Sequence, residues 1–196
     1  MPWQSETLRK TVHLSSLIIP LSYRYIFGFD NRRFVFAVLL VSLVISLLIE
    51  FNRFWQLSFR KTFNRIFGRI LRKHELKNFT GATYLLFASL ICVAFFEPLT
   101  ASAAIAFLSI GDTFAAIIGI NYGKRKFLRN NKSLEGSLAC FVSCLIFGLF
   151  WLREPWTAII GALAATAAEL GNIPLDDNIK IPLAAALAIS ITKIFI

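Results

Sequence analysis

The chain has 196 residues, of which 57% are hydrophobic and 16% are charged, with a mean hydropathy of +0.66 and a formal net charge of +10. These values lie outside the range of soluble globular domains, so the sequence predicts an integral membrane protein. Cys92, Cys140 and Cys144 stand inside apolar runs and form no CxxC or Cys/His cluster, so the sequence suggests neither a disulfide framework nor a zinc site.

Apolar runs long enough to cross a bilayer recur along the whole chain. A transmembrane helix needs about 20 largely apolar residues. Six runs approach this length: 34–51, 79–96, 101–120, 135–152, 156–170 and 181–196. Segment 14–29 is a weaker seventh because it contains Pro20 and Arg24, so we expect it to be broken, tilted or interfacial. The sequence predicts an all-α, polytopic membrane protein with six to seven transmembrane helices in a single domain, 1–196.

Charged residues near the start of the chain fall on one face of a helix. Arg9, Lys10 and His13 follow Glu6 by three, four and seven residues. A solvated amphipathic helix and a topology signal explain this pattern as well as a functional cluster does. Both interpretations stay open.

Segment 52–77 is strongly basic. Only Glu75 opposes its basic residues, which are Arg53, Arg60, Lys61, Arg65, Arg69, Arg72, Lys73 and Lys77. Apolar residues between them form one helical stripe: Phe59, Phe63, Ile66, Phe67 and Ile70. The pattern predicts a basic amphipathic helix that lies on anionic lipid headgroups at the cytoplasmic face, where each cation contributes about 1 kcal/mol. Nucleic acid is therefore not an expected partner.

Asp112 is the one charged residue in the run 101–120. An aspartate at the centre of a membrane helix costs roughly 2.5 to 3.5 kcal/mol, and such acids usually line a polar cavity or an ion site. The alternative is a packing aspartate paired with an arginine or a backbone amide. Small residues around it, from Gly111 to Gly119, would let another helix approach closely.

Further polar residues are predicted at the same end of the molecule. The positive-inside rule places the basic segments 52–77 and 121–132 together in the cytoplasm. Lys124, Lys126 and Lys132 could neutralise a polyphosphate, although the loop is not a P-loop because Arg125 follows Lys124. Carboxylates in the following spans and loops would provide hard oxygen ligands suited to Mg²⁺, or would cap helices and balance the basic loops. They are Asp112, Glu135, Glu169, Asp176 and Asp177.

Several of these stretches together resemble a family of membrane lipid kinases that use CTP, which includes dolichol kinase, phytol kinase and CTP-dependent diacylglycerol kinase. The matching stretches are 6–13, 111–116 with Gly119, Gly123 and Lys124, then 131–137, and Glu169 followed by 176–182. The resemblance covers most of the chain from residue 79 onward, and the chain is shorter than eukaryotic dolichol kinases. It implies transfer of the γ-phosphate of CTP to the hydroxyl of a membrane lipid alcohol, with Mg²⁺, at the cytoplasmic face.

Site roles follow as expectations from the residues and their predicted topology together with this resemblance. Asp112 or Glu135 would act as the catalytic base, and the choice between them stays open. The expected metal ligands are Asp112, Glu169, Asp176 and Asp177. The expected nucleotide and phosphate ligands are Arg9, Lys10, His13, Lys124, Lys126, Lys132, Ser133, Gly136 and Asn178.

Two other classes of function are compatible with parts of the pattern. The sequence distantly resembles CDP-diacylglycerol synthases, which attack the α-phosphate of CTP and release pyrophosphate. An ion or lipid transporter is the non-enzymatic alternative, since intramembrane acids also relay ions. A transporter would carry polar residues through its depth, whereas here they gather at one end apart from Asp112. The acceptor lipid and a homo-oligomeric state are left open.

Overall fold

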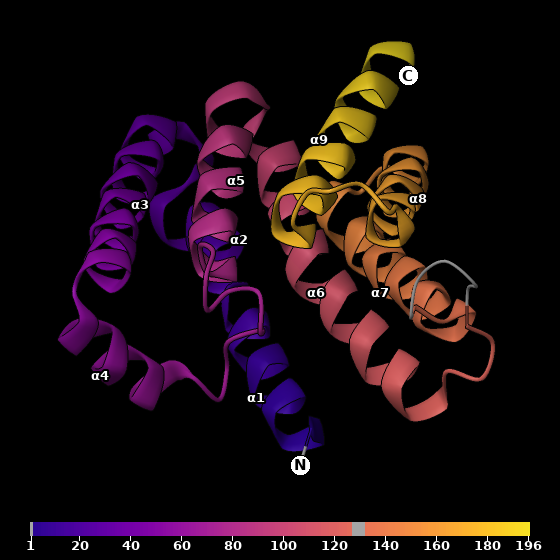
Figure 1. The fold of residues 1–196 in the computed structure, drawn as a ribbon. Coiled ribbons are helices and arrows are strands. Elements are labelled where there is room, and N and C mark those ends of the chain that lie inside the picture. The colour runs from indigo at the N-terminus through magenta and orange to yellow at the C-terminus, as the bar shows by residue number, and fades with distance from the viewer. Residues whose placement is uncertain (1, 127–131) are drawn as a thin grey trace.

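The computed structural model describes residues 2–126 and 132–196, and it is helical throughout these ranges apart from loops (Figure 1). Its elements are α1 (Pro2–Ser15), α2 (Ile18–Ser22), α3 (Arg32–Trp55), α4 (Leu57–Phe67), α5 (Gly81–Phe95), α6 (Pro98–Tyr122), α7 (Leu134–Leu152), α8 (Pro155–Leu170) and α9 (Asp177–Phe195). Lys126 and Ser133 form an isolated bridge that closes the base of the α6–α7 loop.

Within the described residues, four helical stretches are long and apolar enough to cross a membrane: Phe29–Trp55, Pro98–Tyr122, Leu134–Leu152 and Asp177–Phe195. Gly81–Phe95 and Pro155–Leu170 are shorter apolar helices that correspond to the other two predicted spans. These helices confirm the predicted all-α membrane protein.

The weak seventh span, 14–29, is not one continuous helix. The chain passes from α1 through α2 into a single π-helical turn, Tyr23–Phe27, and then into the 3₁₀ turn Phe29–Asn31. Pro20 cannot donate a backbone hydrogen bond inside α2. Gly28 separates these two turns. Its φ of +76° is a backbone conformation that residues other than glycine rarely adopt.

The predicted amphipathic helix in 52–77 occupies only part of that segment. α4 ends at Phe67, and Ile70 lies beyond it in an irregular stretch that leads to α5. This stretch folds around Glu75, whose carboxylate accepts hydrogen bonds from the backbone amides of Arg72 at 2.7 Å and Gly81 at 2.9 Å. A local side-chain network therefore replaces further helical hydrogen bonds.

α6 lies at the centre of the bundle and packs against α7, α9 and α1, whereas α3 packs on α5 at one edge (Figure 1). Small residues allow α6 and α7 to touch: a methyl group added at Gly136 would lie 2.7 Å from the Ala115 carbonyl oxygen. Cys140 and Cys144 are buried free thiols beside Gly111, and Cys92 is also a buried free thiol. All three therefore behave as small core residues.

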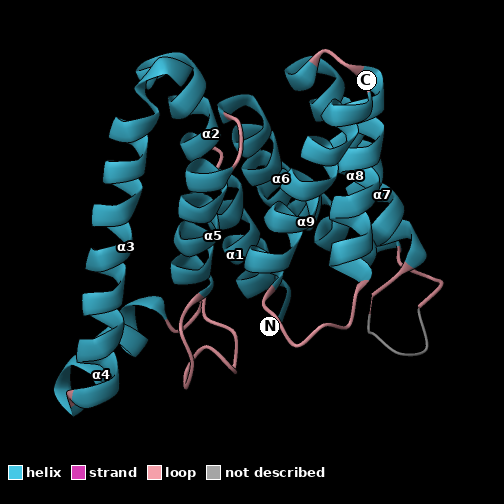
Figure 2. Ribbon diagram, turned by 90° about the horizontal axis from the view of Figure 1, so that it is seen from above, coloured by secondary structure: helices cyan, strands magenta, loops and turns pink. Residues whose placement is uncertain are grey.

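The loops 68–80 and 171–176 lie at the same end of the bundle as α4 and the first residues of α1 (Figure 2). The described parts of the loop between α6 and α7, residues 123–126 and 132–133, are at this end as well (Figure 2). The α7–α8 turn and the C-terminus lie at the opposite end. The helices thus bring distant polar segments of the sequence together.

Candidate active site

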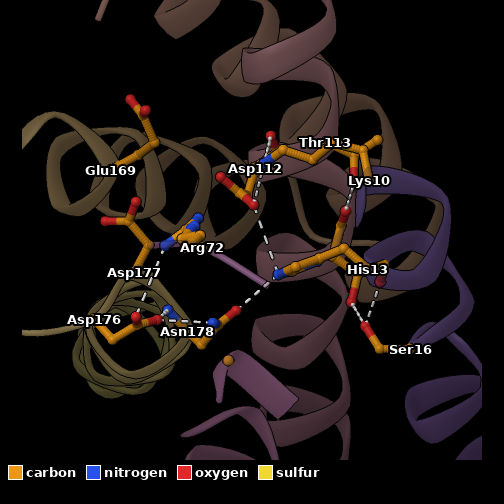
Figure 3. Close-up of polar contacts among 12 residues, drawn as sticks. Lys10, His13, Ser16, Arg72, Asp112, Thr113, Glu169, Asp176, Asp177 and Asn178 are labelled. Atoms are coloured by element: carbon orange, nitrogen blue, oxygen red, sulfur yellow. Dashed lines mark hydrogen bonds and ion pairs between the residues drawn. The ribbon is translucent and has the colours of Figure 1, made fainter. Parts of the chain in front are cut away.

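Asp112 is a buried carboxylate on α6 that faces α1 (Figure 3). Lys10 Nζ donates to Asp112 Oδ2 at 2.5 Å and to the Asp112 carbonyl oxygen at 2.9 Å. His13 Nε2 lies 3.6 Å from the same Oδ2 atom. A charge-assisted hydrogen bond to a cation offsets the cost of burying this carboxylate. Its partner is a lysine from the first helix of the chain.

His13 is held by a chain of hydrogen bonds that begins at α9. Asp176 Oδ1 accepts hydrogen bonds from the Asn178 backbone amide at 2.9 Å and from Asn178 Nδ2 at 2.7 Å, which caps the helix. The side-chain oxygen of Asn178 consequently faces His13 Nε2, at 2.7 Å. Because that oxygen can only accept, we assign the ring hydrogen to Nε2 from this network.

Lys132 connects the C-terminal end of α8 to the N-terminal end of α9. Its Nζ atom lies 2.9 Å from Glu169 Oε1 and 3.4 Å from Asp177 Oδ2, and it also donates to the Glu169 carbonyl oxygen. Burial alone would lower the pKa of Lys132, but the carboxylates of Asp177 and Glu169 outweigh it and raise the pKa above its ordinary value. The ammonium group therefore stays charged at neutral pH. The second carboxylate oxygen of Glu169, Oε2, is buried and has no hydrogen-bond partner in the described part of the chain.

Arg72 enters the site from the loop that follows α4. Its Nη1 atom lies 3.8 Å from Asp176 Oδ2. Burial would lower its pKa, but the surrounding carboxylates, above all Asp112, raise it. The sequence assigned Arg72 to the headgroup-facing cations, and the only signal of another role was its place three residues before Glu75.

Part of this network lines one cavity of about 470 Å³. The predicted site residues in its lining are Arg9, Lys10, Asp112, Lys126, Lys132, Ser133, Gly136, Glu169 and Asp177. Arg72 adds a further cation. Ser133 Oγ accepts from the Gly136 backbone amide at 3.1 Å and caps α7, so the positive end of that helix also faces the cavity. Such a cavity suits an elongated anion bound beside carboxylates.

Other predicted site residues lie outside this cavity. Both carboxylate oxygens of Glu135 face the Arg125 backbone amide at 3.3 Å, so Glu135 holds the loop before α7. Lys124 is exposed and is not part of the lining. Asp176 acts as the cap of α9, and His13 and Asn178 line a neighbouring cavity. The side chain of Glu6 and all of Asn131 lie outside the described residues.

The expected metal ligands are only partly brought together. Within the described residues, no three acidic, histidine or cysteine side chains form a ready-made metal site. Asp112, Glu169 and Asp177 nevertheless line the same cavity, and Glu169 offers an unpaired buried oxygen. Enzymes that use Mg²⁺ with phosphates usually contribute only one or two carboxylates, so these residues fit the ion.

Comparison with known proteins identifies the family. CTP-dependent diacylglycerol kinase 1 of Schizosaccharomyces pombe is 30% identical over 156 residues, which is 70% of this chain and 70% of that protein. The chain belongs to the CTP-dependent lipid kinase family. No family model and no solved structure matches it.

Other members of the family match over different extents. The dolichol kinase of Saccharomyces cerevisiae is 40% identical over 84 residues, 38% of this chain and 16% of that protein. A probable chloroplastic phytol kinase of Oryza sativa is 29% identical over 199 residues, 92% of this chain and 62% of that protein. The names of these relatives therefore specify three different lipid alcohols: diacylglycerol, dolichol and phytol.

Proposed function

We propose that this protein transfers the γ-phosphate of CTP to the hydroxyl group of a membrane lipid alcohol. The observation that carries the proposal is the cavity in which Arg9, Lys10, Arg72, Lys126 and Lys132 surround three carboxylates at one end of a membrane-embedded bundle. A triphosphate needs this density of positive charge, and a magnesium ion needs the carboxylates. Membership of the CTP-dependent lipid kinase family supports the choice of donor.

The triphosphate would lie along the cations and the start of α7. Lys126 and Lys132 would neutralise its charge from the α6–α7 loop, and Arg9 and Arg72 would do so from the opposite side. Glu169 and Asp177 are the residues that would hold Mg²⁺, which would supply additional neutralisation of charge on the phosphates. Most of the acceleration in phosphoryl transfer comes from such positioning and charge neutralisation.

Asp112 is the carboxylate that we place nearest the reacting groups. It lines the cavity and pairs with Lys10, whereas Glu135 faces a loop amide outside it. Loss of the Asp112 charge would leave Lys10 unpaired and would alter the charge that faces His13. We therefore expect Asp112 to be required for turnover.

The proposal extends to the acceptor and to the membrane surface. Diacylglycerol, a polyprenol or dolichol, and phytol are the candidate acceptors, because the named relatives act on lipids of this class. Lys61, Arg65 and Arg69 are exposed on α4 and just beyond it, where they would contact anionic headgroups at the cytoplasmic face.

The test follows two isotopic labels in the same assay. Purified protein with Mg²⁺ and each candidate lipid receives CTP labelled at the α- or the γ-phosphate. The proposal requires γ-label in one or more lipids and none after chelation of the divalent cation. Entry of α-label into lipid when phosphatidate is supplied would instead identify a cytidylyltransferase, and no label in any lipid would favour transport.

The Asp112→Asn variant should lower kcat by about 100-fold or more, because removal of one electrostatic contact beside the reacting groups commonly costs about 10² to 10³ in kcat. Its matched control is Asp30→Asn, at an exposed aspartate in the turn before α3. Near-normal turnover by Asp112→Asn would contradict the assigned role. CTP binding, measured by equilibrium dialysis, checks that the variant is folded.

A further inference from the structure

A second cavity of about 520 Å³ lies beside the phosphate cavity, and Arg9 and Arg72 line both. Most of its walls are apolar. The apolar side chains come from α1, α3, α4, α5 and the loop after α4: Val12, Ile49, Phe63, Phe67, Ile70, Leu71, Leu85 and Leu86. The proposed function leaves this cavity without a role.

The acidic groups along these walls are already engaged. Glu50 Oε2 lies 2.6 Å from Arg53 Nη2, and Glu75 accepts from two backbone amides. The hydroxyls of Ser46 and Thr83 lie 2.7 Å apart. Because these polar groups already have partners, they do not need a hydrogen bond from a ligand. The greater part of the cavity therefore suits a hydrocarbon chain.

His13 stands where the two cavities meet. Its Nε2–H is directed to Asn178, and its Nδ1 atom is buried with no hydrogen-bond partner among the residues that the structure describes. With the ring hydrogen on Nε2, a neutral imidazole carries a lone pair on Nδ1. Nδ1 could therefore accept a hydrogen bond from a hydroxyl group. His13 therefore adds a polar group to the lining of this cavity, close to Asp112 of the proposed phosphate site.

We propose that the apolar cavity holds a hydrocarbon chain of the lipid alcohol and that His13 Nδ1 accepts the proton of its hydroxyl group. This inference rests on the proposed function. The hydroxyl oxygen forms a bond to the γ-phosphorus, while the bond from that phosphorus to the β–γ bridging oxygen breaks and its electron pair leaves with CDP. The proton passes to Nδ1, and Asp112 Oδ2, 3.6 Å from Nε2, offsets the charge of the imidazolium. The proton is later released to water.

α4 gives the lipid a route to this cavity. Phe63 and Phe67 line the cavity, while Lys61 and Arg65 on the same helix are exposed. An amphipathic helix of this kind, with aromatic residues on one face and basic residues on the other, lies in the interface between headgroups and acyl chains. A lipid alcohol would consequently reach His13 from the membrane surface, with its tail under α4.

The cavity is tested by filling it. Ala82 lines the cavity and is itself exposed, so Ala82→Trp adds bulk there without replacing a core side chain. Ala37→Trp, at an exposed position of α3 outside both cavities, is the matched control. The probe is diacylglycerol with a diazirine in one acyl chain, crosslinked by light to the full-length protein in nanodiscs and mapped by mass spectrometry.

We expect the probe to label residues of α1, α4 and α5 in the wild type and in Ala37→Trp, and Ala82→Trp to lose that labelling. In turnover, Ala82→Trp should raise KM for the lipid by about tenfold while KM for CTP is unchanged. Equal labelling of all three proteins, or labelling confined to other helices, would overturn the assignment. Labelling is independent of turnover. If the wild type is labelled in the cavity but phosphorylates no lipid, the proposed function fails while the cavity assignment stands.

The role of His13 is tested by chemical rescue. His13→Ala should lower kcat by about 100-fold, a common contribution of a general base, with normal CTP binding. Added imidazole should restore part of kcat in His13→Ala and none in Asp112→Asn, because only the former lacks a ring. Undiminished kcat, or a loss that imidazole does not recover at any concentration, would overturn proton transfer to His13.

Discussion

Each carboxylate of the phosphate cavity is paired with a cation from a distant part of the sequence. Lys10 reaches Asp112 from α1, and Lys132 reaches both Glu169 and Asp177. Removal of one member of a buried ion pair destabilises the fold, because the other charge is left buried and uncompensated. The sequence singled out Asp112 but could not name Lys10 as its partner, since 102 residues separate them.

The Lys132 network should stabilise the fold measurably. We expect Lys132→Met to lower the free energy of unfolding by on the order of 2 kcal/mol, because hydrogen bonds to charged groups are lost. Lys193→Met, which breaks an exposed pair with Glu97 at 2.7 Å, should cost less than about 1 kcal/mol. Unfolding in mixed micelles measures both.

A double-mutant cycle identifies the partner. Lys132→Met with Glu169→Gln should cost less than the sum of the two single changes, with a coupling of about 0.5 to 3 kcal/mol. Strict additivity would mean that the two side chains do not interact in the membrane.

At the scale of elements, the cavity depends on the close approach of α6 and α7. Gly119, Gly123 and Gly136 lie where these helices meet, and a methyl group added at Gly136 would also come within 3.2 Å of the Gly119 Cα atom. The density of small residues in 111–119 predicted a close neighbour for this helix. It did not identify α7, since any helix could occupy such a surface.

Gly136→Ala should separate the two helices and lower the free energy of unfolding by about 1 to 3 kcal/mol, as overpacking usually does. Activity should fall with it, because Gly136 lines the cavity. Gly171→Ala is the milder comparison, since the nearest atom to its added methyl group would be 3.2 Å away. If Gly136→Ala is no more harmful than Gly171→Ala, the approach of the helices is looser than described.

α4 and the loop after it show why composition alone misassigned some cations. Of the basic residues in 52–77, Arg53 is buried beside Glu50, and Arg60 donates to the carbonyl oxygens of Arg53 and Phe54 at the end of α3. Arg72 faces the cavity. A count of charge cannot separate cations that face lipid from those that complete the fold.

For the whole molecule, hydropathy predicted the arrangement well because a membrane span is a local property of the sequence. The run 101–120 became Pro98–Tyr122, and 135–152 became Leu134–Leu152. The last predicted span, 181–196, begins earlier, at Asp177, because Asp176 caps the helix. The positions of Glu135 and Lys124 outside the cavity depend on side-chain direction, which a count of spans does not contain.

The alternation of helices places the loops 68–80 and 171–176 at one end of the bundle and the α7–α8 turn at the opposite end (Figure 2). We expect a single cysteine at Lys73 or Arg125 to react with a membrane-impermeant maleimide only from the cytoplasmic side, and one at Arg153 only from the other side. Cys92, Cys140 and Cys144 are buried and should remain unlabelled. Labelling of Lys73→Cys and Arg153→Cys from the same side would contradict the topology.

The contact between Lys10 and Asp112 also has a consequence for biosynthesis. Lys10 leaves the ribosome long before α6 does, and Asp177 is made later still, so the nascent chain inserts several helices with unmatched charges at their ends. No early segment can assemble the cavity by itself. The lining of the cavity is therefore complete only when α9, which contributes Asp177, joins the helices already in the membrane.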